Sequence, residues 1–94
     1  MARTVNKGEL VDEIASKADL TKVAAKDALE ALLGTITEAL QRRNKVQITG
    51  FGSFEARWRK PRMGRNPQSG EEVEIEGKWA PAFKPGKSLK DDVA

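Results

Sequence analysis

The chain contains no cysteine and no histidine among its 94 residues. Without thiols it has neither a disulfide framework nor a thiolate metal site, and nothing indicates an oxidising compartment, so a cytoplasmic location is expected. Without histidine it lacks the most common general base and a common metal ligand. We therefore expect no catalytic residues, no metal site and no cofactor, and we do not expect an enzyme.

Aromatic residues and long apolar runs are also scarce. The aromatic side chains are three phenylalanines and two tryptophans: Phe51, Phe54, Phe83, Trp58 and Trp79. No stretch of 18 apolar residues occurs, so no membrane association is expected. The length predicts one domain, residues 1–94. Because such a short chain with few large apolar side chains has a thin core, we expect self-association to stabilise it.

The positive charge of the chain is concentrated in its second half. The formal net charge is +3, yet residues 1–44 contain seven basic and seven acidic side chains and are balanced. Five cations without an acid among them occur between positions 57 and 65: Arg57, Arg59, Lys60, Arg62 and Arg65. A local excess of positive charge of this kind is typical of a site that binds a polyanion.

The first 44 residues predict two helices. Asn6 followed by Glu9 has the form of a capping box, and apolar residues at helical spacing predict a first helix from about Lys7 to Ala18. Thr21 is suited to cap the second helix. This helical part, 1–44, is expected to carry the dimer contacts.

The second helix has an apolar stripe with three- and four-residue steps, which includes Leu33, Ile36 and Leu40. We assign these side chains to the core and the dimer interface. The helix should end at two arginines, after which Asn44 is suited to a left-handed turn because asparagine tolerates that conformation.

The apolar period changes from 3.6 to 2 at Lys45, which indicates β-structure in residues 45–83. Val46 and Ile48 alternate with polar residues, and Gly50 to Gly52 predict a turn. The following strand has an apolar face and a charged face. Residues 57–66 and 71–79 are expected to pair as a protruding ribbon, an arm of about 57–79, and residues 84–94 to form a C-terminal helix.

The sequence "GRNPQSGE", residues 64–71, lies at the end of this ribbon and has no large apolar side chain. Asparagine, proline and glycine are common turn formers, so a simple turn is one interpretation. The basic strand before it has two interpretations as well. It can bind an anion, or it can be a solvated strand neutralised by cross-strand pairing with the acids that follow the tip, Glu71, Glu72, Glu74 and Glu76.

Four motifs together resemble one known family. "NKGELVDEIASKADLTK" (6–22), "GFGSFEARWRK" (50–60), "GRNPQSGEEVEI" (64–75) and "PAFKPGKSLKDDV" (81–93) are similar to the bacterial histone-like HU proteins and the related integration host factor subunits. The resemblance implies an α+β fold and an intertwined dimer. In this fold, two N-terminal helices form the base, a three-stranded antiparallel sheet carries a protruding β-ribbon arm, and a short helix ends the chain.

The resemblance also implies which residues contact DNA. Pro67 corresponds to a wedge that enters the minor groove between base pairs. The arm is implied to contact DNA through Arg57, Arg59, Lys60, Arg62, Arg65 and Asn66. Lysines on the body, Lys7, Lys87 and Lys90, are implied to hold the DNA that flanks the kink. Phe51, Phe54 and Phe83 correspond to aromatics of the core and dimer interface.

The function implied is that of a nucleoid protein that binds double-stranded DNA with low sequence specificity, bends it, wraps it and compacts it. The expected partners are bent, nicked or junction DNA and a second copy of the chain, with a heterodimer with a paralogue left open. One alternative is a sequence-selective DNA-bending subunit like integration host factor. Another is an interaction module whose basic arm docks on an acidic protein.

A few positions of the arm depart from the usual pattern of the family. Pro61 lies in the ascending strand, where proline is tolerated only if its missing N–H faces outward or lies at a bulge. Trp58 and Met63 replace residues that are often charged, and Glu76-Gly77 replaces a position that is commonly proline. These differences concern the local geometry of the arm. Trp79, at the base of the descending strand, is placed either to pack on Trp58 or to shield the root of the arm.

Overall fold

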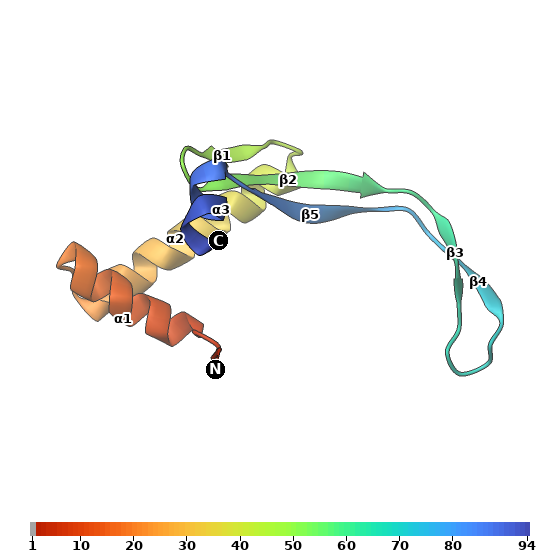
Figure 1. Ribbon diagram of the computed structural model, residues 1–94, viewed down its shortest axis with the longest axis horizontal. Helices are drawn as coiled ribbons and strands as arrows, with labels where there is room; N and C mark the ends of the chain where they lie inside the picture. Colours follow the sequence, from red (N-terminus) through yellow and green to blue (C-terminus); the bar gives the residue numbers. More distant parts are fainter. Residues whose placement is uncertain (1) are drawn as a thin grey trace. The chain divides into compact units, whose positions relative to one another are not determined.

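The computed structural model describes residues 2–94, and within this range the chain forms three α-helices and five β-strands (Figure 1). Their order along the chain is α1 (Lys7–Ala18), α2 (Lys22–Gln41), β1 (Val46–Ile48), β2 (Gly52–Arg59), β3 (Arg62–Arg65), β4 (Glu72–Ile75), β5 (Lys78–Pro85) and α3 (Lys87–Val93). The expected α+β architecture is confirmed. The chain divides into two compact units, one up to residue 37 and one from Glu38 to Ala94.

Side-chain caps begin both N-terminal helices where the sequence predicts them. The Oδ1 of Asn6 accepts a hydrogen bond from the Glu9 N–H at 2.9 Å, which satisfies a backbone donor at the start of α1. The Oγ1 of Thr21 accepts from the Ala24 N–H at 3.1 Å and does the same for α2. The predicted helix starts are therefore confirmed. Of the capping box at α1, only the Asn6 half is formed among the described residues, while the Glu9 carboxylate accepts a hydrogen bond from Nη1 of Arg3 at 2.7 Å.

The end of α2 corrects one sequence prediction. Arg43, rather than Asn44, adopts the left-handed conformation, with φ of 64°. The guanidinium Nη1 of Arg43 donates hydrogen bonds to the carbonyl oxygens of Leu40 and Gln41 at 3.1 and 3.2 Å. These bonds satisfy carbonyl groups that the helix leaves free at its end, and they offset the steric cost of a positive φ at a residue with a Cβ.

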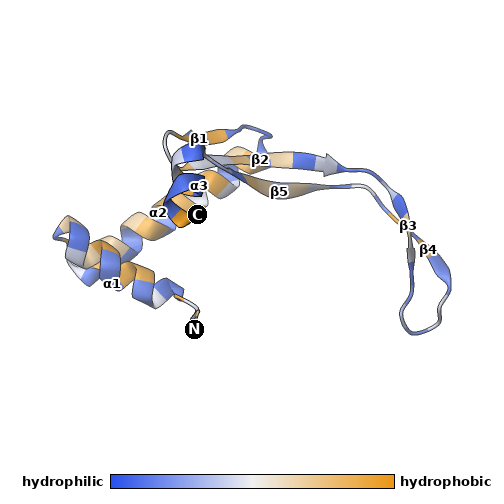
Figure 2. Ribbon diagram, in the orientation of Figure 1, coloured by the Kyte–Doolittle hydropathy of each residue, from blue (hydrophilic) through white to orange (hydrophobic). Residues whose placement is uncertain are grey.

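Little of the apolar surface is buried within one chain. Among residues 2–94, the buried hydrophobic side chains are Ala25 and Leu29. The accessible surface is 7886 Å², whereas a compact protein of 10.3 kDa exposes about 5,400 Å². Large apolar side chains, including Leu33 and Phe51, are more than two-fifths exposed. Figure 2 shows hydrophobic and hydrophilic segments alternating along α2.

The second unit contains a three-stranded antiparallel sheet in the order β1-β2-β5. A tight turn joins β1 to β2, in which Gly50 has φ of 84° and the Phe51 N–H donates to the Ile48 carbonyl at 3.0 Å. Since paired residues lie on the same face of a sheet, the register assigns each side chain to a face. The expected strands and turn are confirmed.

One face of this sheet is apolar and the other is polar. The apolar face contains Val46, Ile48, Phe54, Ala56, Trp58, Trp79, Pro81 and Phe83. On it, the ring of Phe83 lies 4.8 Å from that of Phe54 and 5.5 Å from that of Phe51, centroid to centroid. A Cβ on Gly52 would lie 2.7 Å from the Phe83 ring, so glycine is required at this close approach.

The arm is less continuous than the sequence predicts. The expected strands 57–66 and 71–79 are each interrupted: β2 pairs with β5 as far as Arg59 and Lys78, and β3 pairs with β4 from Arg62 and Ile75 onward. We call residues 60–61 and 76–77 the joint, and residues 60–77 the arm. Pro61 has no N–H to donate to the ladder, which explains why pairing stops at this point.

The register is the same on both sides of the joint. Three residues separate Arg59 from Arg62 on one strand, and three separate Ile75 from Lys78 on the other. The joint is therefore an interruption without a bulge. Figure 1 shows β2 and β5 running side by side into this stretch, with the loop of the tip beyond β3 and β4.

Candidate nucleic-acid interface

The polar face of the three-stranded sheet is rich in cations. Its register brings together Gln47, Ser53, Glu55, Arg57, Arg59, Lys78 and Lys84 from three strands. The four cations of this set come from β2 and β5, and the one acid is Glu55. A sheet surface with this excess of positive charge attracts a polyanion.

Glu55 holds two of these cations by ion pairs. Its Oε1 lies 2.8 Å from Nη2 of Arg57, accepts a hydrogen bond from Nε of the same guanidinium at 3.0 Å, and lies 3.4 Å from Nζ of Lys84. The Arg57 hydrogen bond, with a further contribution from Lys84, lowers the pKa of the Glu55 carboxyl below its ordinary value. The carboxylate is therefore charged at neutral pH and competes with any outside anion for these two side chains.

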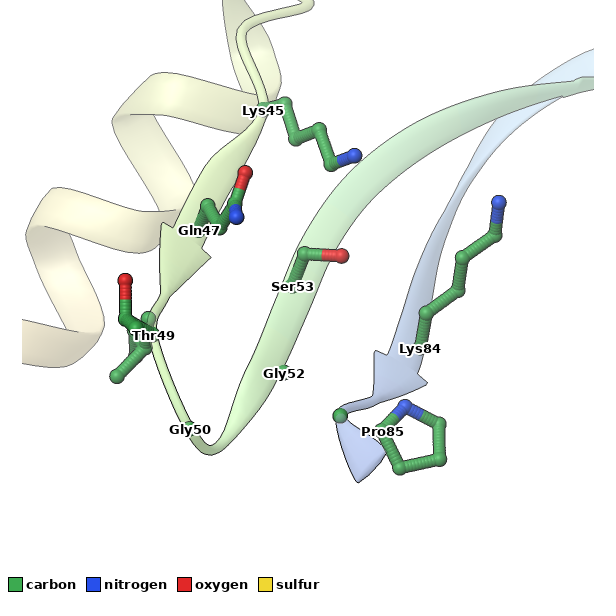
Figure 3. Close-up of a pocket in the computed structure, with 10 residues that line it drawn as sticks. Lys45, Gln47, Thr49, Gly50, Gly52, Ser53, Lys84 and Pro85 are labelled. Atoms are coloured by element: carbon green, nitrogen blue, oxygen red, sulfur yellow. The ribbon is translucent and has the colours of Figure 1, made fainter. Parts of the chain in front are cut away.

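An open hollow of about 250 Å³ lies at the end of the same face, beside the β1–β2 turn. Lys45, Gln47 and Thr49 line it from one side, Ser53 from β2 and Lys84 from β5 (Figure 3). The ammonium groups of two lysines and a serine hydroxyl are donors that suit phosphate oxygens.

The cations at the end of β2 and in the arm have no carboxylate partner among the residues described, since Arg59, Lys60, Arg62 and Arg65 form no ion pair in residues 2–94. Arg65 lies directly opposite Glu72 in the ladder. The cross-strand neutralisation that the sequence left open is thus not formed as ion pairs, and these side chains are exposed and available to an outside anion.

The tip is a loop held by its own hydrogen bonds. The Asn66 N–H donates to the Glu71 carbonyl at 2.8 Å, and the Gly70 N–H donates to the Asn66 carbonyl at 2.7 Å. The Oδ1 of Asn66 accepts from the Gln68 N–H at 2.9 Å, as in an Asx-turn. Gly70 has φ of 74°, which suits glycine. Pro67 lies exposed between these bonds, so its ring is presented on a closed loop.

The three lysines assigned to the body differ in their contacts. Lys7 lies 3.4 Å from the Glu30 carboxylate, and Lys87 lies 3.4 Å from that of Asp91 one turn later in α3. Both pairs are exposed, and such pairs contribute little to stability, so an outside phosphate can replace the carboxylate at small cost. Lys90 forms no ion pair within residues 2–94 and lies in the last turn of α3.

Comparison with known proteins identifies the family. A family model described as "Bacterial DNA-binding protein" matches residues 5–94. The chain is 53% identical over 89 residues to DNA-binding protein HU of Geobacillus stearothermophilus, which covers 95% of this chain and 99% of that protein. This chain is a member of the HU family of bacterial DNA-binding proteins.

Solved structures of HU proteins have the same fold. An Anabaena HU, solved as a cocrystal with DNA, superposes with a TM-score of 0.92 at 51% identity over 96% of this chain and 98% of that one. HU from Thermotoga maritima gives a TM-score of 0.68 at 41% identity, over 96% and 100% of the two chains. The resemblance stated from the motifs and the expected HU-like α+β fold are both confirmed.

The structure of this HU-family chain gathers only some of the residues that the sequence singled out. Arg57 and Arg59 lie on the polar face of the sheet, whereas Lys60, Arg62, Arg65, Asn66 and Pro67 belong to the arm. Lys7 belongs to the other compact unit. Among residues 2–94, no group of acidic side chains is arranged to hold a metal ion, and no helix is long and apolar enough to cross a membrane.

Sequence reasoning assigned no role to several charged residues of the polar face and its hollow. Lys45 and Lys84 line the hollow, Glu55 restrains two cations, and Lys78 lies opposite Arg59. The period-two alternation of β2 and β5 contained the signal for Glu55 and Lys84. It could be used only once the register had placed Ser53 opposite Lys84.

Proposed function

We propose that this protein binds double-stranded DNA through the minor groove with low sequence specificity, and that it bends, wraps and compacts DNA in the bacterial nucleoid. The observation that carries the proposal is the tip of the arm. There, an exposed proline lies on a loop closed by its own hydrogen bonds and is preceded by cations that have no carboxylate partner among the residues described.

The chemistry of a wedge favours proline at this place. An apolar ring inserted between two base pairs replaces stacking, and proline has no N–H that would lose its hydrogen-bond partner there. Unstacking one step costs a few kcal/mol, which contacts along the bent flanks offset. The closed loop of the tip keeps the ring of Pro67 in place before DNA arrives.

The cations act on the phosphates and on the groove. Arg62 and Arg65 reach the minor groove beside the wedge. The pattern of donors and acceptors in the minor groove distinguishes sequences poorly. The polar face of the sheet, with Lys45 and Lys84, lies against the phosphate backbone, and Lys7, Lys87 and Lys90 hold the flanks. Low sequence specificity and a preference for bent, nicked or junction DNA follow, because distorted DNA requires less work to kink.

The functional unit is a homodimer. The chain buries two hydrophobic side chains among those described and exposes others, including Leu33, Phe51 and Phe83. A monomer with this much apolar surface in water is unstable, and a second copy that covers the apolar stripe of α2 and the phenylalanine cluster supplies the missing core. Ile36 and Leu40, which are half-buried, complete the same stripe.

Mobility measurements on three DNAs test the proposed function. Linear, nicked and four-way-junction duplexes of equal length are titrated at two salt concentrations, together with linear duplexes of scrambled sequence. We expect tighter binding to nicked and junction DNA, equal binding to scrambled sequences, and a strong loss of affinity with salt because several counterions are released. Loss of binding on scrambling would instead support a sequence-selective subunit. Binding insensitive to salt would favour docking on a protein.

A further inference from the structure

The joint of the arm contains an aromatic contact that the proposed function does not use. The indole of Trp58 extends from the end of β2 over Gly77 on the opposite strand. Its Cζ2 lies 2.5 Å, and its Cη2 2.9 Å, from the point where a Cβ on Gly77 would be. The Cδ of Pro61 lies 2.9 Å from the same point. The ring therefore occupies the space that a side chain at position 77 would need.

The geometry is that of a diagonal cross-strand pair. The direct partner of Trp58 is Trp79, and Gly77 lies two residues before it. Diagonal neighbours are within reach of large aromatic side chains, and an aromatic ring placed over a strand glycine compensates for the missing side chain and holds the register. Gly77 is half-buried although it lies where the ladder is interrupted.

A second aromatic contact supports the ring from the sheet side. The Trp58 and Trp79 rings meet edge to face, with centroids 5.7 Å apart and planes at 61°. The guanidinium carbon of Arg43 lies 4.4 Å from the centre of a Trp79 ring, a cation–π contact that links the pair to the end of α2. Contacts thus run from Arg43 through Trp79 and Trp58 to Gly77 in the joint.

We propose that Trp58 is a positioning residue of the arm. Its indole, seated over Gly77 and against Pro61, replaces the absent ladder at the joint and limits how far β3 and β4 swing relative to β2 and β5. If the protein binds DNA as proposed above, this restraint fixes where along the duplex Pro67 meets the minor groove, and this part of the inference rests on the proposed function. Since the joint keeps the register, the restraint acts on the direction of the arm and not on the pairing of its strands.

Four proteins test the positioning role: wild type, Trp58→Ala, Gly77→Ala and the double variant. Hydrogen exchange of the β3 and β4 amides in the free protein reports the order of the arm without DNA. Trp58→Ala should speed this exchange about two- to fivefold, as loss of a cross-strand aromatic pair does. Gly77→Ala alone should also speed it, because the new Cβ displaces the indole.

The double variant supplies the decisive comparison. With the indole removed, the Cδ of Pro61, 2.9 Å from the Cβ position, is the one close neighbour left of the three atoms nearest to it. The φ of Gly77 is not in the positive range, so the backbone there tolerates alanine, which is better ordered than glycine in a strand. Gly77→Ala should therefore speed the exchange much less in the Trp58→Ala background than in the wild type, and an equal effect in both backgrounds would overturn the proposal. Trp58→Phe should restore little of the protection, because the atoms over Gly77 are Cζ2 and Cη2 at the outer edge of the indole, which the shorter phenylalanine ring does not supply.

Trp79→Ala is the matched control, because it removes an indole of similar exposure that does not cover Gly77. In that background Gly77→Ala should still speed the exchange.

Energy transfer across a doubly labelled duplex then gives the consequence for DNA: Trp58→Ala should reduce the mean bend and broaden its distribution, and an unaltered bend would overturn the positioning role. Failure of the wild type to bind duplex DNA would overturn the proposed function instead, while the exchange data still decide whether Trp58 orders the arm.

Discussion

The three-stranded sheet and the arm are both antiparallel, and the pairing register of β2 with β5 continues unchanged into β3 and β4. The two regions differ in the interactions that stabilise them. β2 and β5 pair over eight residues each, and Phe51, Phe54 and Phe83 pack together on one face. β3 and β4 have four residues each, and Met63 and Val73 are exposed. The sheet is stabilised by apolar packing, whereas a two-stranded ribbon without such packing is only marginally stable in water.

The difference assigns separate tasks to the two regions. In the proposed function, a second copy of the chain covers the apolar face of the sheet, and DNA from outside the protein orders the arm. Cations without ion-pair partners and an exposed proline make DNA a suitable surface. Substitutions in the sheet should therefore change folding, and substitutions in the arm should change binding with little effect on folding.

The largest effect is expected from Phe83→Ala, which removes the ring that contacts both other phenylalanines. We expect a loss of roughly 3 kcal/mol in the free energy of unfolding, as for truncation of a packed phenylalanine. The control Met63→Ala, in the arm, should cost less than about 0.5 kcal/mol. Both values are measured by urea denaturation at one protein concentration. Equal losses would contradict the division between sheet and arm.

Association should be visible in the thermal unfolding of the wild type at several protein concentrations. If a second copy completes the core, the melting temperature Tm of the wild type rises with protein concentration under reversible conditions. The reason is that unfolding then also dissociates the dimer. A Tm that stays constant over a hundredfold range of concentration would mean that one chain folds alone.

A smaller effect, confined to binding, is expected from Arg65→Ala. Loss of one phosphate contact should weaken DNA affinity and reduce the slope of log affinity against log salt by about one. Stability should not change, since Arg65 forms no ion pair among the described residues. Lys17→Ala, which removes a cation on α1, is the control and should leave the affinity nearly unaltered. Titrations at four salt concentrations separate the two variants.

The smallest effect is expected from Glu55→Gln, which releases Arg57 and Lys84 from their common carboxylate. DNA affinity should rise by about threefold and the salt slope should steepen, because two cations become free to bind phosphates. Glu38→Gln removes the same charge from an exposed side chain without an ion pair among residues 2–94, and serves as control. A weaker affinity of Glu55→Gln would show that the ion pairs orient these cations for DNA.

The pH dependence of stability sharpens this last comparison. The pKa of Glu55 is lowered in the folded chain, so its ion pairs stabilise the fold above the ordinary carboxyl pKa, and this contribution is lost as the pH falls through the lowered value. Wild type should therefore be more stable than Glu55→Gln at neutral pH, and the difference should shrink in acid. Unfolding curves at a series of pH values measure it.

Local signals in the sequence predicted most of the fold. Caps at Asn6 and Thr21, helical periodicity and the change of period at Lys45 each depend on neighbours a few residues apart. Period-two alternation also placed the arm and the order of the strands, and the family motifs implied the same antiparallel sheet with a protruding arm. Contacts across strands were less accessible, because they require the register.

Three features illustrate that limit. The interruption at Pro61 depends on which N–H groups face the partner strand, and the seat of Trp58 over Gly77 depends on a diagonal contact. The left-handed residue at the end of α2 is Arg43, because its side chain donates hydrogen bonds to the last carbonyl groups of the helix. The sequence predicted Asn44 instead, because asparagine tolerates the left-handed conformation. The packing of Trp79 on Trp58, by contrast, was one of two roles that the sequence left open for Trp79, and the structure shows this contact.

The measurement that tests the central claim most directly is the bend angle of a short duplex, followed by energy transfer between dyes at its two ends. Saturating wild type should bring the dyes closer, and Pro67→Ala should lose most of this change while its Kd rises by less than about tenfold, because the wedge acts on the kink and the cations on the affinity. Gln68→Ala, the exposed neighbour in the tip, should bend DNA like the wild type. An unchanged bend with Pro67→Ala would contradict the account.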